Sequence, residues 1–442
     1  MRRFEYKDNR SYKFWEIKVE GNAYTVRYGK VGAKGSTSTK SFATPEKAAA
    51  DAEKKIRSKV GKGYAEVALE SAAPAQSASS VSDWSVHADQ LQAAGDPWGE
   101  RISVFMQWEE AKGAGKRKFK KRLDELDAAH GEHFYGKALA SLLSDKSEFE
   151  GVARLKWKHG YIDEARLRVG YGHKGPSVED VLAALVAAPA SKHMKKLVLG
   201  RIADHSDDYG TCMTILGRGG LDELEYLFVG DFSYPDDTEI SWVTIGDLGA
   251  ALPGLPALQT LRARGGGVRM SNFEHAKLRR LEVESGGLPG AGLRGFAEAK
   301  LPELVHVSLW LGTDDYGGST EIGDLQALWS NPNLAKLSHL GLQNSIMQDE
   351  VAKAVAESKI LEQLSSVDLS MGTMRDPGAR ALLANVDRFK HLKSLNLDDN
   401  FIPWSHREGL RNALGDTLQW GGQRSPEDWG DDELHYYTAV AE

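Results

Sequence analysis

The sequence predicts a multidomain α+β and α/β protein. A small antiparallel sheet with one helix is followed by a helical cap and then by a solenoid with a parallel sheet and outer helices. One short apolar pattern recurs from about Met194 to Leu397, strand-like alternation before one helix marks the N-terminus, and an Ala/Ser-rich stretch separates the two. The expected segments are a first module 1–67, a flexible linker 68–82, a helical cap 83–180, a solenoid 181–403, and a C-terminal cap with an acidic tail 404–442.

The recurring pattern has apolar residues at its first, fourth and sixth positions, and Leu392, Leu395 and Leu397 form its clearest copy. The last two side chains of each copy point the same way from a short strand. One such unit cannot bury its apolar face alone, so units are expected to stack around a shared core. The other copies are Leu364-Val367-Leu369, Leu337-Leu340-Leu342, Leu304-Val307-Leu309, Leu278-Leu281-Val283, Leu258-Leu261-Ala263, Leu224-Leu227-Val229 and Met194-Leu197-Leu199.

From Ser370-Met371-Gly372 to Leu397 the repeat resembles the ribonuclease-inhibitor type of leucine-rich repeat, and Asn400 stands where that family places an asparagine ladder. Residues beside the inward apolar positions are expected on the concave side, where they would bind a protein partner. Trp310 is the best anchor, because tryptophan is enriched in binding hot spots, unless it packs under the loop 314–320. The predicted partner-binding residues are Arg262, Arg264, Glu282, Glu284, His306, Trp310, Gln343, Asp368 and Asp398.

Charge is unevenly distributed along the chain. Residues 1–67 hold 16 Lys and Arg against 8 Asp and Glu, and the remainder holds 40 against 55. A basic module joined to an acidic remainder favours an anionic partner for the first and a different partner for the second. Cys212 is the only cysteine, which excludes an internal disulfide. No apolar run is long enough to span a membrane, so we expect a cytoplasmic protein without membrane contact.

The first module resembles a WGR domain. The resemblance rests on Phe14-Trp15-Glu16-Ile17, Tyr28 to Gly35, Lys40-Ser41-Phe42 and Lys59 to Tyr64, in the order that the family has them. It implies an antiparallel sheet packed by one helix, and it implies nucleic-acid binding, since WGR domains of poly(ADP-ribose) polymerases bind DNA ends.

The family's Trp-Gly-Arg is Tyr28-Gly29-Lys30 in this chain. Tyrosine still stacks on a base, whereas lysine loses the planar fork that holds phosphate in two places. Gly29 would let the backbone approach the ligand, and Lys30, Lys34 and Lys40 would contact phosphates. The alternative is that Tyr28 is a core residue and that the lysines form a solvated face.

Residues 83–175 are expected to be helical, with a break at Gly95-Asp96-Pro97. The segments Leu91 to Glu100, Leu126 to Gly131 and Trp157 to Ile162 are similar to the repeat-companion domain of bacterial leucine-rich-repeat proteins. This resemblance implies a cap over the first solenoid strand. His130 and His133 lie three residues apart, but no further ligand stands at a convincing spacing, so we expect no metal site.

No catalytic constellation is found in the sequence. The residues therefore favour a non-enzymatic adaptor without a cofactor, in which module 1–67 binds nucleic acid, most simply DNA ends or backbone, and the concave face binds an unidentified protein. The alternative is a scaffold that binds only proteins. Binding that is insensitive to salt and to Lys30→Ala would favour that alternative.

Overall fold

The computed structural model describes residues 2–8, 11–30, 36–60, 64–67, 83–203, 207–430 and 433–441. The chain divides into two compact units, Met1–Ser82 and Asp83–Glu442, here called the N-terminal unit and the solenoid unit. Each unit has its own hydrophobic core. The predicted linker 68–82 lies outside the described residues. Within the described part of the chain, no helix combines the length and apolar character needed to cross a membrane.

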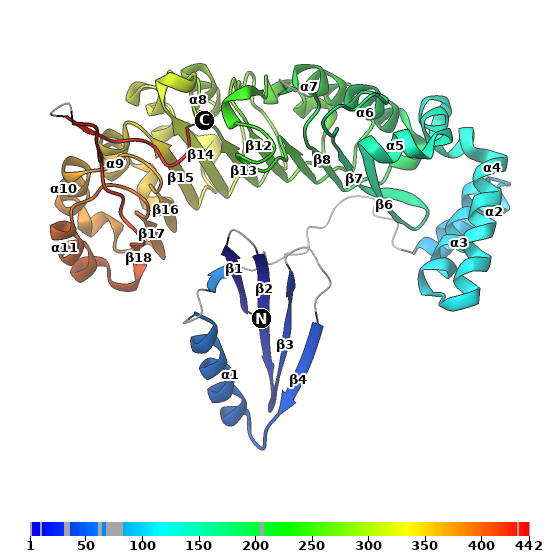
Figure 1. Ribbon diagram of the computed structural model, residues 1–442, viewed down its shortest axis with the longest axis horizontal. Helices are drawn as coiled ribbons and strands as arrows, with labels where there is room; N and C mark the ends of the chain where they lie inside the picture. The colour runs from blue at the N-terminus through cyan, green and yellow to red at the C-terminus, as the bar shows by residue number, and fades with distance from the viewer. Residues whose placement is uncertain are drawn as a thin grey trace. The chain divides into compact units, whose positions relative to one another are not determined.

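The N-terminal unit is a five-stranded antiparallel sheet in the order β4-β3-β2-β1-β5, with one helix packed against β2 and β3 (Figure 1). This confirms the small antiparallel sheet and single helix that the sequence predicts. The elements are β1 (Arg2–Asp8), β2 (Ser11–Glu20), β3 (Ala23–Lys30), β4 (Ser36–Ser41), α1 (Pro45–Val60) and β5 (Ala65–Val67).

Local sequence accounts for this unit. Gly21 takes a positive φ of 55° in the two-residue turn between β2 and β3, a conformation that glycine adopts without strain. Pro45 is the first helical residue of α1, where its missing N–H costs nothing. The core joins Phe4, Trp15, Ile17 and Tyr24 of the sheet to Ala52 and Ile56 of the helix.

The solenoid unit is organised by an eleven-stranded sheet in the order β18-β17-β16-β15-β14-β13-β12-β10-β8-β7-β6. Every described neighbour pair is parallel except β6 with β7. Its strands are β6 (Ala153–Lys158), β7 (Tyr161–Leu167), β8 (Lys196–Leu199), β10 (Tyr226–Val229), β12 (Thr260–Arg264), β13 (Arg280–Glu284), β14 (His306–Gly312), β15 (His339–Ser345), β16 (Ser366–Asp368), β17 (Ser394–Asn396) and β18 (Leu418–Gln419).

Helices flank the other side of this sheet, which leaves its strands along the concave side of the unit (Figure 1). The two-residue strands β9 (Asp207–Asp208) and β11 (Val243–Thr244) pair with each other, as do β19 (Glu427–Asp428) and β20 (Leu434–His435). The helices are α2 (Trp84–Ala93), α3 (Pro97–Glu110), α4 (Gly113–Ser144), α5 (Lys146–Val152), α6 (Val178–Ala187), α7 (Gly210–Gly217), α8 (Gly290–Ala297), α9 (Gln348–Glu357), α10 (Asp376–Ala384) and α11 (Trp404–Leu414).

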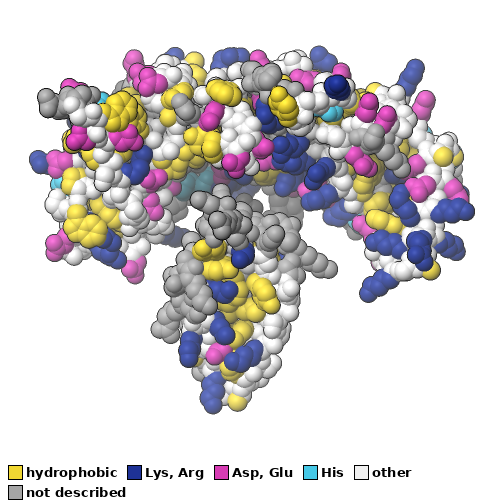
Figure 2. Space-filling view, in the orientation of Figure 1, with side chains coloured by type: hydrophobic (Ala, Val, Ile, Leu, Met, Phe, Trp, Pro, Cys, Tyr) yellow, Lys and Arg dark blue, Asp and Glu magenta, His cyan; other side chains and the backbone are white. Residues whose placement is uncertain are grey.

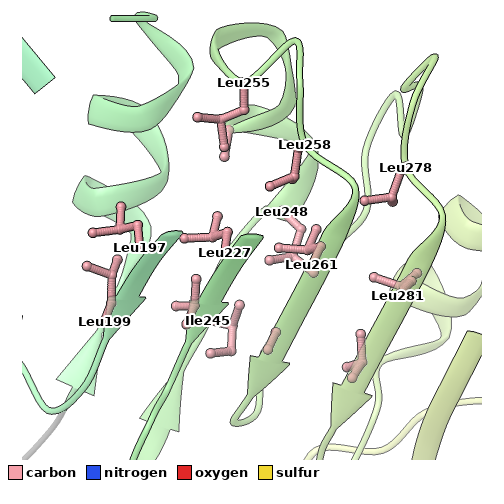
Figure 3. Packing of buried hydrophobic residues seen from close by; sticks show 14 of the residues in the cluster. Leu197, Leu199, Leu227, Ile245, Leu248, Leu255, Leu258, Leu261, Leu278 and Leu281 are labelled. Atoms are coloured by element: carbon pink, nitrogen blue, oxygen red, sulfur yellow. The ribbon is translucent and has the colours of Figure 1, made fainter. Parts of the chain in front are cut away.

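The core of the solenoid unit is the recurring apolar pattern itself. Leu197, Leu227, Leu261 and Leu281 occupy matching register positions on successive strands and are at most 1% exposed. Figure 3 shows them side by side, with Leu248 and Leu258 from the connecting segments above them. All eight predicted copies form strands or their flanks, which confirms the solenoid with its parallel sheet.

The cap differs from expectation in one respect. Helices α2 to α5 are present, but the segment after them forms β6 and β7, which extend the solenoid sheet as an antiparallel hairpin. The hairpin turns at His159 and Gly160, both with positive φ. The alternation of apolar and polar residues in the sequence could have predicted strand β7, because buried Ala165 and Leu167 flank the part-exposed Arg166. The hairpin closes the sheet at the end where the solenoid begins.

The C-terminal segment is docked on the solenoid. Leu410 and Leu414 of α11 are buried, as expected of a cap, whereas Trp404 is 70% exposed and does not join that core. Beyond β20, the Tyr436 ring packs on Phe401. The main-chain N–H of Ala439 then donates to the carbonyl of Met371, and Val440 N–H donates to Asn344 Oδ1.

Candidate nucleic-acid interface and the concave face

A cavity of about 400 Å³ opens on the helix-covered face of the N-terminal sheet. Tyr28 of β3 lies opposite Trp15 of β2 and Ser36 of β4, so all three share this face. Lys55 and Lys59 stand four residues apart on α1 and therefore present one helix face to it. The cavity joins aromatic rings to three ammonium groups, and its lining residues are Trp15, Tyr24, Val26, Tyr28, Ser38, Lys40, Lys55 and Lys59.

Lys40 is held at the cavity by a short polar chain. Its Nζ lies 3.2 Å from Asp51 Oδ2, and the Tyr24 hydroxyl donates to the same oxygen at 2.8 Å. The hydrogen bond from Tyr24, followed by that from Lys40, lowers the pKa of Asp51. Burial, with help from Asp51, raises the pKa of Tyr24 to about 12. Asp51 is therefore a carboxylate and Tyr24 a neutral phenol at physiological pH, so Asp51 offers Lys40 a charged partner at the cavity.

Lys59 lies over two aromatic faces, with its Nζ 5.6 Å from the Trp15 centroid and 4.6 Å from that of Tyr64. The ring quadrupoles attract the ammonium group and orient it. Sequence reasoning missed Lys55 and Lys59. The i, i+4 spacing of Lys55 and Lys59 indicates that they share one helix face. The spacing alone does not indicate whether that face is turned toward the sheet.

Of the five predicted nucleic-acid residues, the structure brings Tyr28 and Lys40 together. Tyr28 is 49% exposed, so the alternative that it is a core residue is wrong. Gly29, its neighbour in β3, belongs to the opposite face of the sheet. Lys30 ends β3 and its side chain lies outside the description, while Lys34 lies outside the described residues altogether.

Four of the predicted partner-binding residues on the concave face pair with one another. Arg262 Nε lies 2.6 Å from Glu282 Oε2, and its Nη2 lies 3.0 Å from Glu284 Oε1. Arg264 Nε lies 2.6 Å from Glu284 Oε2. The Arg262 guanidinium also stacks 4.5 Å from the centroid of Phe228. Arg280 Nε also donates to Glu282 Oε1 at 2.6 Å, so three arginines share two glutamates in one fixed network.

His306 and His339 stack across adjacent strands, with ring centroids 4.0 Å apart and an interplanar angle of 3°. Burial, assisted by the neighbouring His339, lowers the pKa of His306 to about 2. Burial also lowers the pKa of His339, whose Nδ1 lies 2.7 Å from Ser366 Oγ. Both rings are therefore neutral at physiological pH. The sequence prediction named His306 but not its partner, which the strand register supplies.

This stacked pair predicts a pH dependence. The folded-state pKa of His306 lies below its unfolded value. At mildly acidic pH His306 is therefore protonated in the unfolded chain but not in the folded chain, which favours unfolding. Stability is therefore lost as pH falls below about 6.5, by up to about 2 kcal/mol for this group between pH 7 and pH 5. We expect His306→Gln to abolish this contribution, so that the free energy of unfolding falls less between pH 7 and pH 5 than in the wild type. Urea unfolding at both pH values measures the difference.

The control is His130→Gln, because it also removes one histidine, but at an exposed position on α4. It should leave the pH dependence of stability as in the wild type. An equal pH dependence in wild type and His306→Gln would contradict the prediction.

Gln343, Asp368 and Asp398 belong to a hydrogen-bonded chain along the concave face. Gln343 Nε2 donates to Ser370 Oγ at 3.2 Å, and that hydroxyl donates to Asp368 Oδ1 at 2.6 Å. Asn396 Nδ2 donates to Asp368 Oδ2 at 3.0 Å, and Asp398 N–H donates to Asn396 Oδ1 at 3.0 Å. These hydrogen bonds order the side chains of Gln343 and Asp368 in the absence of a partner.

Trp310 lies beside Gln343 in the register of β14 and β15. Its ring is half-buried and packs against the solenoid core, so it shows only part of its surface to solvent. Its role as a binding anchor stays a prediction.

Sequence reasoning missed a group of cations on the first strands of the sheet, here called the basic concave surface: Arg154, Arg166, Arg168 and Lys196. Arg166 Nε lies 2.6 Å from Asp231 Oδ2, and Arg168 Nη2 lies 3.3 Å from Asp237 Oδ1. Figure 2 shows Lys and Arg side chains gathered over this part of the sheet. Their alternation with buried Ala165 and Leu167 was the missed signal.

A larger cavity of about 1200 Å³ lies between α3, α4, α5 and β6. Arg101, which is 3% exposed, forms part of its wall. Its guanidinium pairs with Asp127, donates from Nη2 to the Tyr135 hydroxyl at 2.9 Å and from Nε to the Gly160 carbonyl at 3.1 Å. These bonds tie the helical cap to the β6–β7 turn, so Arg101 has a structural role. In the part of the chain that the structure describes, no three His, Cys, Asp or Glu side chains gather as metal ligands.

Comparison with known proteins identifies the N-terminal unit. Residues 1–71 match the family model described as WGR domain. In Escherichia coli K12, the uncharacterized protein YfeS is 46% identical over 65 residues, covering 15% of this chain and 27% of that protein. Protein YehF of the same organism is 44% identical over 68 residues, covering 15% and 25%. The chain thus spans about a quarter of the length of these curated relatives.

The comparison of folds extends over the whole chain. The crystal structure of a Bacteroides fragilis protein, a Northeast Structural Genomics Consortium target, matches with a TM-score of 0.59 at 24% sequence identity, covering 100% of this chain and 99% of that chain. At 24% identity this comparison shows a shared fold only. The chain is thus modular: a WGR domain, residues 1–71, precedes a solenoid of stacked repeats whose leucines are buried.

Proposed function

We propose that this protein is a non-enzymatic adaptor whose WGR domain binds DNA and whose solenoid binds a protein. The observation that carries the proposal is the cavity in which the half-exposed Tyr28 meets Lys40, Lys55 and Lys59. An aromatic face beside several ammonium groups suits a nucleic acid, because bases stack on rings while phosphates attract cations.

The geometry of the cavity supports phosphate contact. The Lys40–Asp51 pair is solvent-exposed, with side-chain exposures of 54% and 27%. Exposed ion pairs of this kind contribute little free energy, so a phosphate can replace Asp51 as the partner of Lys40 at small cost. Tyr28 has ring surface open for stacking on a base or a sugar. These contacts are independent of base sequence, which favours recognition of the backbone or of a DNA end.

The solenoid supports the second half of the proposal. Its concave face is a continuous strand surface whose polar side chains are already ordered by the Arg262–Glu284 and Gln343–Asp368 networks. A pre-ordered surface loses less conformational entropy on binding than a mobile one. Solenoid proteins characteristically use such extended concave surfaces for binding.

The test is fluorescence anisotropy of the full chain with blunt, nicked and single-stranded DNA at low and physiological salt. We expect Tyr28→Ala to weaken binding roughly 5- to 150-fold, which corresponds to the about 1–3 kcal/mol that one stacked base contributes. We expect Lys55→Ala to weaken binding and to reduce the slope of log affinity against log salt by about 1.

Lys54→Ala is the matched control, since Lys54 is exposed on the same helix but does not line the cavity. It removes the same charge and should change affinity least. Equal losses in Lys54→Ala and Lys55→Ala would point to general electrostatic attraction rather than to the cavity. Salt-insensitive binding, or binding unchanged in Tyr28→Ala, would favour a scaffold that binds only proteins.

A further inference from the structure

The first strands of the solenoid sheet place like charges directly opposite each other. Arg154 of β6 and Arg166 of β7 are register partners on the concave face. Like charges directly opposite on one sheet face are destabilising. Asp231 neutralises Arg166 at 2.6 Å, but within the described residues the Arg154 side chain has no hydrogen bond or ion pair.

Lys196 of β8 is a second cation without a carboxylate partner in the described chain. Its Nζ lies 4.7 Å from the centroid of Tyr226, on the same face. It neighbours Glu164 in the register, but Glu164 already accepts from Lys156 at 2.7 Å. Two surplus positive charges therefore lie on strands two places apart, separated laterally by roughly 10 Å at the usual strand spacing.

This surplus is confined to one half of the concave face. The outward positions of β14 to β18 carry no lysine or arginine among the described residues; they include Asp368, and Asp398 follows two residues after β17. The face therefore changes from basic at β6–β8 to acidic at β16–β17. The anionic part of a partner lying along the solenoid would therefore meet unpaired cations at the first strands and none at the outward positions of β14 to β18 in the described chain.

We propose that the basic concave surface binds an extended acidic peptide segment of a partner protein, with carboxylates placed at Arg154 and Lys196 and an apolar side chain against Tyr226. Side chains two residues apart on an extended chain share one face and are about 6.6 Å apart, so carboxylates four residues apart, roughly 13 Å, reach both cations. Arginine suits this role because its planar fork binds a carboxylate in two places.

The surroundings favour a peptide over a nucleic acid. Asp231, Asp237, Glu282 and Glu284 are interspersed among the cations of this face. A regularly charged phosphate backbone would lie against these carboxylates, whereas a peptide can carry its few acids only where the free cations stand. The proposal rests on the protein-binding role of the solenoid given above.

The test uses the full chain and a fluorescein-labelled decapeptide with glutamate at alternate positions, beside an otherwise identical peptide with lysine. The glutamate peptide should bind and the lysine peptide should not. Arg154→Ala/Lys196→Ala should weaken glutamate-peptide binding on the order of tenfold or more, because two charge-assisted contacts are lost. DNA binding of this variant should be unchanged.

Arg117→Ala/Lys353→Ala is the matched control, because it removes the same two charges from exposed positions on α4 and α9. It should bind the peptide like the wild type. Equal weakening by both double variants, unaltered binding by Arg154→Ala/Lys196→Ala, or loss of DNA binding in that variant would each overturn the proposal. Tyr28→Ala separates the two sites, since it should affect DNA and leave the peptide.

A second readout needs no ligand. Because Arg154 has no ion-pair partner within the described residues and faces Arg166 across the register, Arg154→Ala should not lower Tm more than Arg117→Ala does. A lower Tm for Arg154→Ala would show that this side chain stabilises the fold and would remove the reason for assigning it to a ligand.

Discussion

Gly312→Ala is expected to lower the free energy of unfolding of the solenoid unit by about 3 kcal/mol or more. Gly312 ends β14 with a φ of +69°, which L side chains rarely adopt. A Cβ at this position would lie 1.9 Å from the carbonyl oxygen of Gly286, so one of the two backbones must move. That carbonyl also accepts from Thr313 N–H at 2.8 Å, and the movement would strain this hydrogen bond.

The matched control is Gly317→Ala in the loop that follows. Gly317 has a φ of +89°, but a Cβ there would meet nothing within 4 Å. It should cost about 1–2 kcal/mol, the price of the left-handed conformation alone. Urea unfolding followed by far-ultraviolet circular dichroism measures both variants. An effect of Gly317→Ala equal to that of Gly312→Ala would show that backbone conformation, not the contact with Gly286, sets the cost.

Asn400→Ala is expected to destabilise the last repeats by about 3 kcal/mol. The side chain is fully buried, and its Nδ2 donates to the carbonyls of Leu369 at 2.9 Å and Leu397 at 3.2 Å. Its Oδ1 accepts from Met374 N–H at 3.1 Å. Alanine leaves these buried backbone groups without partners, and each such group costs about 1–3 kcal/mol.

Asn396→Ala is the comparison for this prediction, because Asn396 is also an asparagine with hydrogen bonds but is half-buried on the concave face. Water can replace its bonds to Asp368 and Asp398, so the expected cost is at most about 1 kcal/mol. Equilibrium unfolding in urea checks both variants. If Asn396→Ala were as costly as Asn400→Ala, burial would not be the cause.

The repeat solenoid could be predicted from the sequence because its apolar pattern is periodic and involves residues close together in the chain. Leu395 and Leu397 point inward for the same reason as Leu340 and Leu342, since alternate strand side chains share one face. The single helix of the WGR domain was readable for a similar reason, from Pro45 and the spacing of Ala48, Ala52 and Ile56. The position of Asn400 followed from the resemblance to a repeat family, and its side chain is buried and hydrogen-bonded to the backbone of Leu369 and Met374.

The candidate sites were only partly readable. Tyr28 and Lys40 were predicted, but Lys55 and Lys59 come to the same cavity from a helix. On the concave face, the sequence names charged residues without saying which of them neutralise each other. Arg262 and Glu284 were predicted as separate contacts, yet they are paired at 3.0 Å. Arg154, which has no such pair among the described residues, was not predicted because its segment was expected to be helical.

Sequence alone therefore determined the modules, the inward leucines and the families they resemble, because strand and helix periodicity and local motifs are set by neighbours along the chain. Only the tertiary structure decided which charges are free and which are paired, because that depends on contacts between strands about thirty residues apart. His306 and His339 illustrate the difference. Each is an ordinary concave-face histidine in the sequence, and only their stacking at 4.0 Å and their burial make them neutral at physiological pH.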